Sequence, residues 1–142
     1  MKLLSYQAKH FSWEAFSQTI PDADPQSNGA VDDAAVVWMH VEWDDMEDRN
    51  RVFKHALKQI KWVANKKVLK TVVLHSFAHL GGRPADADFA RTIIQDLATR
   101  LRDTGYTVHT TPFGWFCAWN LDVYGNSMAK VFKHIVPKTA ST

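Results

Sequence analysis

The chain has 142 residues, 46% hydrophobic and 23% charged, with a formal net charge of +2 at pH 7, so we expect one domain, residues 1–142, that buries about two thirds of its unfolded surface. So small a net charge does not by itself indicate nucleic-acid binding, and no apolar run approaches the ~20 residues of a membrane span. The single cysteine, Cys117, excludes an intramolecular disulfide and, with a first apolar run too short for a signal peptide, predicts a soluble cytoplasmic domain.

The chain begins with an expected strand and two expected loops. Residues 2–6 predict a short, central strand. Residues 7–13, polar with aromatic residues mixed in, predict a loop or the start of an irregular return. Residues 21–29 hold two prolines, a glycine and small polar residues. Such a composition indicates a surface loop, and it makes this segment the part of the chain best suited to disorder.

A strand and a helix are expected next. Residues 34–43 predict a strand whose His40 and Glu42 face either a cleft or, from an edge strand, the solvent. Asp44 and Asp45 then cap a helix with one apolar face, formed by Phe53, Ala56, Leu57, Ile60, Val63 and Ala64. A second face carries a row of lysines, which is either a phosphate-binding patch or, more commonly, a solvated surface: Lys54, Lys58 and Lys61.

The stretch 71–82 predicts a buried strand that ends in a loop with a candidate site. Residues 71–76 read as a strand covered on both faces, and the loop after them contains His79 and a glycine pair. Ligands of open α/β sheets sit beyond the carboxyl ends of strands. The imidazole of His79 titrates near neutral pH and suits proton transfer or ligand orientation. The alternative is a loop histidine that is hydrogen-bonded to nearby backbone.

The remaining chain predicts a helix over 86–104, strands over 106–110 and 115–124, and a short last helix over 128–134. The helix over 86–104 has an apolar stripe and a glycine stop at Gly105. Because the last two strands are joined too briefly for a parallel crossover, we expect a compact α/β fold with a mixed sheet.

A second candidate site is the turn 112–114 and the strand after it. Gly114 lets a ligand approach the backbone closely. Cys117 on that strand is either a small buried hydrophobic residue or a nucleophile partnered with His79. The spacing His75-x3-His79 does not fit a zinc site, because it spans a strand end and a loop and includes no glutamate. We therefore expect no metal and no other cofactor.

Three motifs stand in a characteristic order and spacing: Ser76-Phe77-Ala78-His79-Leu80, Thr111-Pro112-Phe113-Gly114-Trp115-Phe116 and Ile135-Val136-Pro137. Together they resemble the archaeal-type threonyl-tRNA synthetase editing domain, over nearly the whole chain. The resemblance implies a D-aminoacyl-tRNA deacylase-like fold, a homodimer, and hydrolysis of serine mischarged on threonine tRNA by a positioned water and the tRNA's own terminal hydroxyl. Serine and threonine differ by one methyl, which a pocket discriminates by only ~1–3 kcal/mol.

Carried over by position, the resemblance gives His79 the place of the family's site histidine. It places the terminal adenosine of the tRNA against Phe77, Ala78, Pro112 and Phe113, with Gly114 and Phe116 in the same segment and Val41 and Glu42 on a neighbouring strand. Some positions depart from the family. Phe116 and Cys117 replace a tyrosine and a lysine, and Lys130 replaces a glutamate of the last helix. We expect Lys130 to restore a positive charge and to act with His79 and Cys117.

Three functions are open from the sequence. The first is an aminoacyl-tRNA deacylase that acts in trans or beside a threonyl-tRNA synthetase, whose own catalytic and anticodon-binding domains do not fit in 142 residues. The second is a non-catalytic module that binds a tRNA end or a nucleotide. The third is a hydrolase of another small substrate that uses Cys117 as its nucleophile.

Overall fold

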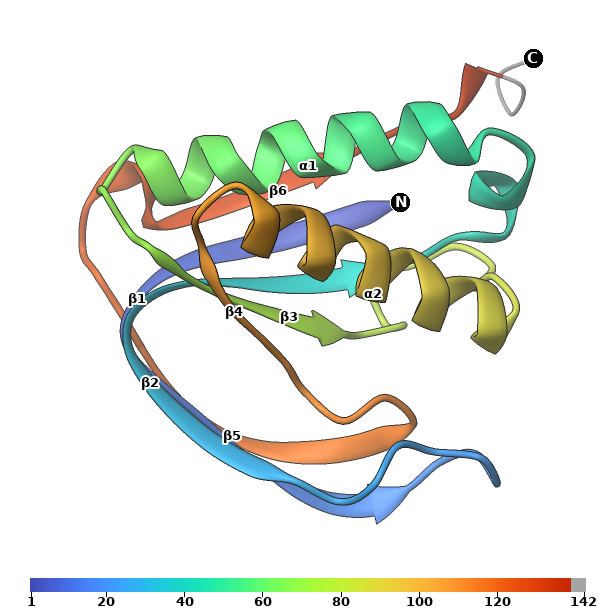
Figure 1. The fold of residues 1–142 in the computed structure, drawn as a ribbon, viewed down its shortest axis with the longest axis horizontal. Coiled ribbons are helices and arrows are strands. Elements are labelled where there is room, and N and C mark those ends of the chain that lie inside the picture. Colours follow the sequence, from blue (N-terminus) through green and yellow to red (C-terminus); the bar gives the residue numbers. More distant parts are fainter. Residues whose placement is uncertain (139–142) are drawn as a thin grey trace.

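Over residues 1–138, which the computed structural model describes, six strands form one mixed sheet (Figure 1): β1 (Lys2–Gln18), β2 (Asn28–His40), β3 (Thr71–Ser76), β4 (Thr107–Thr110), β5 (Trp115–Val123) and β6 (Lys130–His134). The strand order is β4-β3-β2-β1-β5, and β6 also pairs with β1. The pairs β2–β3 and β3–β4 are parallel, whereas β1 is antiparallel to β2, β5 and β6. The predicted mixed α/β fold is confirmed.

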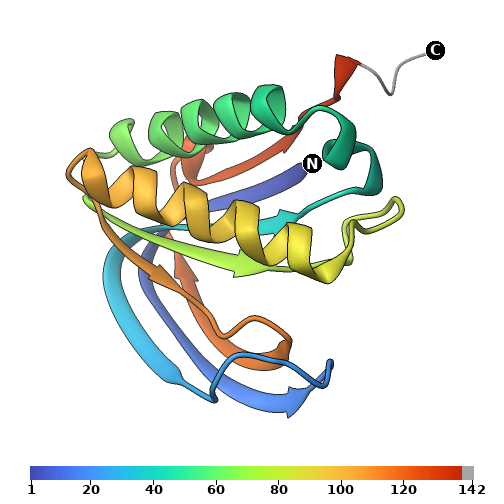
Figure 2. The same cartoon turned by 45° about the vertical axis from the view of Figure 1, so that its right-hand side comes forward.

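Two helices, α1 (Arg49–Asn65) and α2 (Ala87–Asp103), cover the same face of the sheet (Figures 1 and 2). Helix α1 begins later than expected, because Asp45 belongs to a separate 3-10 helix, Trp43–Glu47, and accepts a hydrogen bond from the backbone N–H of Glu42. No helix within the described residues is long and apolar enough to cross a membrane. The predicted stripe of α2 is confirmed, since all of its members are buried: Ala90, Ile93, Ile94, Leu97, Ala98 and Leu101.

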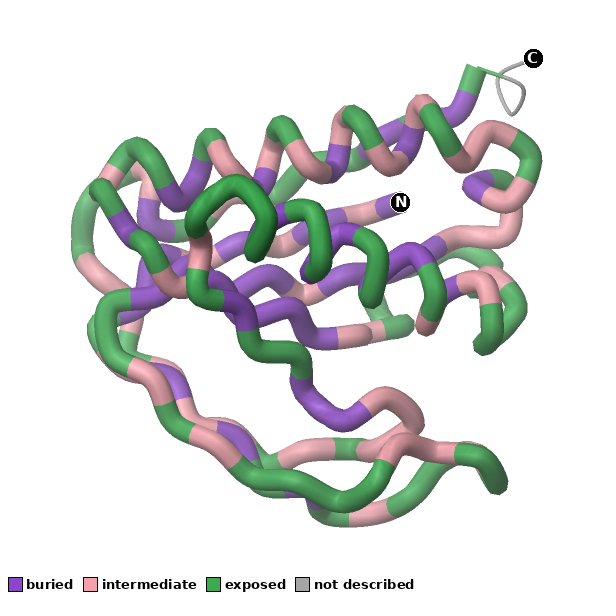
Figure 3. The backbone as a smooth tube through the Cα atoms, viewed as in Figure 1, coloured by how far each residue is buried: buried purple, intermediate pink, exposed green. Residues whose placement is uncertain are grey.

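The first strand is much longer than predicted, and the prediction of a loop over residues 7–13 is wrong. β1 pairs with β2 from Lys2 opposite His40 to Glu14 opposite Asn28. The polar residues that suggested a loop alternate with buried Phe11 and Trp13 instead, which is the pattern of a strand with one face inside. β2 is therefore not an edge strand but lies between β1 and β3. Figure 3 shows the buried stretches of these central strands beneath the helices.

The last predicted helix, over 128–134, is also wrong. A short 3-10 helix, Ser127–Ala129, leads into β6, which pairs with the first part of β1. The reason lies in β1, because β5 pairs with β1 only from Ala8 onward and leaves the edge of its first residues open. Val131 and Phe132 suit a strand, and β6 fills that edge.

The sheet curls strongly, and the curl creates a second core. β4 and β5 stand at opposite ends of the strand order, although residues 111–114 alone connect them (Figure 1). The sheet must therefore bend until its ends approach, and the ring of Trp13 in β1 lies 6.1 Å from that of His109 in β4. Gly29 permits this arrangement, because a Cβ there would come within 2.3 Å of the Trp13 ring.

Candidate functional site

A cavity of about 370 Å³ opens where β2 and β3 end, between the start of α2 and β5. Met39 and Val41 line it from β2 and the residue following its end, and His75 and Ser76 line it from β3. The loop after β3 and the turn before β5 supply the remaining walls. A cavity at the carboxyl ends of two neighbouring parallel strands agrees with the position that the sequence suggested for a ligand.

Most of the predicted site residues meet at this cavity. Nine of them line it: His79, Cys117, Phe77, Ala78, Val41, Pro112, Phe113, Gly114 and Phe116. Two others do not. The carboxylate of Glu42 is engaged by Lys2 and the terminal ammonium, and Lys130 is an exposed residue at the start of β6, opposite Tyr6. The catalytic and binding roles of all these residues remain predictions.

His79 presents its imidazole at the cavity without a polar partner. Its ring lies 5.2 Å from the ring of Phe77 and 6.3 Å from that of Phe116. No hydrogen bond or ion pair to the His79 side chain occurs among residues 1–138. The alternative of a structural histidine tied to nearby backbone therefore finds no support here, and the imidazole is available to a ligand or a water.

His75 is a site residue that the sequence reasoning did not select. Only 3% of it is exposed, and its Nδ1 lies 2.7 Å from the hydroxyl oxygen of Thr111. Burial lowers the pKa of His75 to about 4, so the imidazole is neutral at pH 7. Rings from two other strands pack against it, Trp38 from β2 and Trp119 from β5. A polar residue at a buried position just before a strand ends was the signal that could have found it.

Cys117 is a poor nucleophile in this setting. It is half-buried, and burial raises the pKa of its thiol. Its Sγ contacts the carbonyl oxygen of Trp115 at 3.9 Å, and no hydrogen bond joins it to His79 within the described chain. Because the thiolate is the reactive form, these contacts weigh against a Cys117–His79 pair.

The loop that was expected to be disordered instead braces the turn before β5 through Asp24. The backbone N–H of Asp24 donates to the carbonyl of Phe113 at 2.9 Å. In return, the Phe113 N–H donates to the Asp24 carboxylate at 2.9 Å. The Trp115 indole donates to the Asp24 carbonyl at 2.7 Å. Gly114, with φ +85°, lies so close to Ile20 that a Cβ would approach its Cγ1 to 2.7 Å. Asp24 thus fixes the turn that precedes β5.

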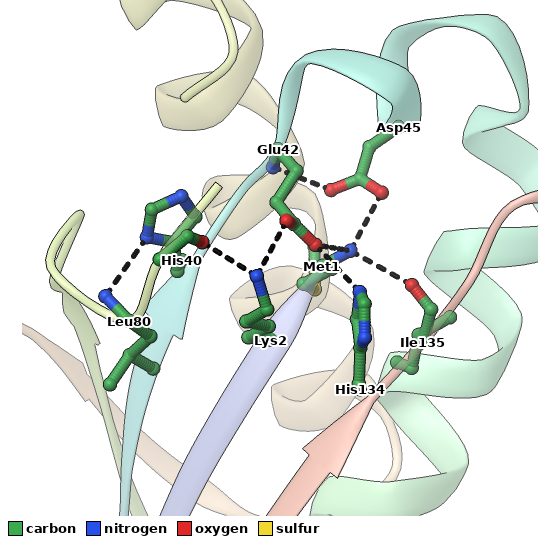
Figure 4. Close-up of polar contacts among 9 residues, drawn as sticks. Met1, Lys2, His40, Glu42, Asp45, Leu80, His134 and Ile135 are labelled. Carbon is green, nitrogen blue, oxygen red and sulfur yellow. Dashed lines mark hydrogen bonds and ion pairs between the residues drawn. The ribbon is translucent and has the colours of Figure 1, made fainter. Parts of the chain in front are cut away.

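A polar network anchors the far end of the His79 loop (Figure 4). Lys2 donates to the carbonyl of Gly81 at 2.6 Å and to Glu42 at 2.9 Å. The Leu80 N–H donates to Nδ1 of His40 at 3.2 Å. Burial lowers the pKa of His40, which keeps Nδ1 free to accept. Burial alone would raise the pKa of Glu42, but hydrogen bonds from Lys2 and the terminal ammonium hold it below its ordinary value.

The same network predicts a stability effect at Asp45. The buried ammonium of Met1 donates to Asp45 at 2.8 Å and to the carbonyl of Ile135 at 2.9 Å (Figure 4). We expect Asp45→Asn to lower the free energy of unfolding by about 2 kcal/mol, because it removes a charged acceptor while Glu42 remains nearby. Urea unfolding at pH 7 measures this, with exposed Asp44→Asn as the matched control. Equal effects of the two substitutions would contradict the prediction.

The chemistry available in the cavity is narrow. Among the described residues, its titratable lining side chains are His75, His79 and Cys117, and no carboxylate, lysine or arginine lines it. Aromatic rings from Phe77, Phe113 and the β5 strand dominate the walls. Such a site suits a ligand with a flat ring, held by stacking and backbone groups, and its one exposed base is an imidazole.

Comparison with known proteins gives consistent matches. A family model described as the archaea-specific editing domain of threonyl-tRNA synthetase matches residues 1–135. The chain is 28% identical to a threonine–tRNA ligase of Thermococcus kodakarensis, over 99% of this chain and 23% of that protein. It is 30% identical to the threonine–tRNA ligase of Methanopyrus kandleri, again over 99% of this chain and 23% of the relative. The chain thus spans less than a quarter of the length of these relatives.

The fold has a counterpart among solved structures. The c-Myc DNA unwinding element binding protein superposes with a TM-score of 0.66, over 96% of this chain and 99% of that chain, at 13% sequence identity. At this identity the likeness concerns the fold alone. It confirms the compact α/β architecture that the sequence predicted.

Proposed function

This chain belongs to the archaea-specific editing-domain family of threonyl-tRNA synthetase, and we propose that it hydrolyses the ester bond of seryl-tRNA to proofread threonine tRNA. One observation carries the proposal. Residues from the two separate motifs of the sequence resemblance, around His79 and around Phe113, line one cavity at the strand ends. A pocket assembled from both motifs supports a shared ligand, the terminal adenosine with its attached amino acid.

The cavity supports a simple division of roles. The aromatic rings of Phe113 and Phe116 stack on the adenine, which every base permits through its flat face. The backbone N–H groups of Ala78 and His79 make no hydrogen bond within residues 1–138 and are free to hold the ribose or the ester. The neutral ring of His75, with Nδ1 occupied by Thr111, helps to fix the shape of the pocket beneath them.

The proposed reaction needs one positioned water. The water oxygen attacks the ester carbonyl carbon while His79 takes the water proton. The bond between the carbonyl carbon and the ribose oxygen then breaks, and the proton passes to that oxygen. Serine and deacylated tRNA are the products. The free hydroxyl of the terminal ribose, next to the ester, orients the water. It does so in the absence of the family's strand lysine, whose position is Cys117 in this chain.

The finer features of the family enter the same proposal. We propose a cytoplasmic chain that works in trans beside a threonyl-tRNA synthetase and pairs as the homodimer that the resemblance implies. The apolar side chains that pairing would cover are Phe132 on β6 and Val136 after it, which are 54% and 45% exposed.

The direct test is release of amino acid from three substrates by the wild-type chain. We expect seryl-tRNA to be deacylated faster than threonyl-tRNA by about tenfold or more, because a pocket that excludes one methyl discriminates by ~1–3 kcal/mol. D-aminoacyl-tRNA serves as the third substrate. Equal rates for serine and threonine would contradict the proposed specificity, and the absence of release from all three would contradict the activity.

A non-catalytic module that binds the tRNA end is the second candidate. It is favoured by the absence of any carboxylate or ammonium among the described lining side chains. Retained binding of adenosine without deacylation would establish this alternative. Cys117→Ser separates a hydrolase that uses Cys117 from the proposed deacylase, because only a mechanism with a nucleophilic thiol would lose its activity with that substitution.

A further inference from the structure

Charge is distributed very unevenly along this chain. Between Asp48 and Asp86 there is no acidic residue, while the same stretch carries nine lysines and arginines. The preceding stretch, residues 22–48, is the reverse, with nine acidic residues and no lysine or arginine. The small net charge of +2 therefore conceals a strongly basic segment, whose centre is helix α1.

The fold adds a cation from another element to this helix. Figures 1 and 2 show β6 running alongside α1. Lys133 of β6 pairs with Leu3, a member of the core under the helices, so Lys133 shares the α1 side of the sheet. We call the resulting patch the α1–β6 basic surface, which consists of Arg51, Lys54, Lys58, Lys61 and Lys133.

Four cations of this surface lie close enough to one another to affect the same side chain, His55. Burial lowers the pKa of His55, and the charges of Arg51, Lys54, Lys58 and Lys133 lower it further, which places these groups within reach of one imidazole. None of the five cations of the surface forms an ion pair within residues 1–138. Like charges one helical turn apart repel, so an anionic partner would relieve a repulsion that the protein leaves uncompensated.

The surface is separate from the cavity. None of its five residues lines the cavity, which is built from the ends of β2 and β3 and from β5. A phosphate backbone is the partner that matches a row of unpaired lysines and an arginine, because each phosphate takes one cation and needs no shaped pocket. Such contacts position a nucleic acid and leave recognition of its end to another site.

We propose that the α1–β6 basic surface binds the phosphate backbone of tRNA, outside the cavity that takes its terminal nucleotide. The choice of tRNA as the nucleic acid rests on the proposed function, whereas the surface itself rests on the charges described above. The surface then supplies affinity for the body of the RNA, and the cavity supplies the chemistry at its end.

The test is the salt dependence of binding to a fluorescently labelled, unacylated threonine tRNA, measured by anisotropy between about 50 and 200 mM salt. The variant combines Lys54→Gln, Lys58→Gln and Lys133→Gln. We expect the slope of log K against log salt to become shallower by about 2 to 3, because each lost phosphate contact removes about 0.7 to 0.9. We also expect at least a tenfold loss of affinity at the lowest salt.

The matched control removes the same charge elsewhere, with Lys9→Gln, Lys70→Gln and Arg100→Gln, three exposed residues that lie outside the α1–β6 basic surface. A selective loss in the first variant supports the proposal. Equal losses in both variants, or no binding by the wild type at the lowest salt, would overturn it. His79→Ala should keep the wild-type slope, because the surface lies outside the cavity. Intact binding by a wild-type chain that releases no amino acid would overturn the proposed function and leave this surface standing.

Discussion

In the His79→Ala variant we expect release of serine from seryl-tRNA to slow by about 100-fold or more. General acid–base groups typically contribute that much, and His79 is the exposed imidazole of the cavity. The other lining histidine cannot readily replace it, because His75 is buried and its pKa of about 4 makes it a weak base. The measurement is single-turnover deacylation over a range of enzyme concentrations, which separates the chemical step from binding.

The loss should lie in the rate of the chemical step and leave binding of the tRNA little changed. His109→Ala is the matched control, since it removes another exposed imidazole that does not line the cavity. An unchanged rate in His79→Ala would exclude the proposed base. The same assay decides the prediction for Lys130, where a loss equal to that of His79→Ala would give it a part in the reaction from outside the cavity.

Local sequence patterns predicted those elements whose own residues determine which face is buried. The run of residues 71–76 matches β3 residue for residue, and the stripe of α2 is buried as expected. The failures depended on distant partners. Residues 7–13 read as a loop until β2 and β5 pair with them. Residues 128–134 were expected to form a helix, and the pairing of β6 with the open edge of β1 decides for a strand.

The site shows the same limit. The two loops that carry His79 and Phe113 were found from their motifs, because turns and glycines mark them locally. No local pattern indicated the role of Asp24, which is hydrogen-bonded to Phe113, 89 positions away in the chain. His75 was passed over for a similar reason, since the rings that bury it come from β2 and β5.

The burial of His75 predicts a stability that depends on pH. Folding lowers the pKa of this imidazole from 6.5 to about 4, so the unfolded chain binds more protons between these values. The contribution of His75 is therefore complete above pH 6.5 and is lost progressively as the pH falls to about 4. The loss amounts to about 3 kcal/mol, a large part of the stability of an ordinary domain.

We expect His75→Asn to remove this part of the pH dependence, because its amide occupies the place of Nδ1 beside Thr111 but takes up no proton. Urea unfolding of both proteins from pH 7 to pH 4 gives the difference curve, in which other titrating groups such as His40 and Asp45 cancel. Thr111→Val is the control, since it removes the hydrogen bond to His75 and leaves the buried imidazole in place. A parallel course of the wild-type and His75→Asn curves would show that His75 is not held neutral. His75 would then also be available as a base beside His79, and the proposal that His79 is the base of the cavity would no longer hold for His79 alone.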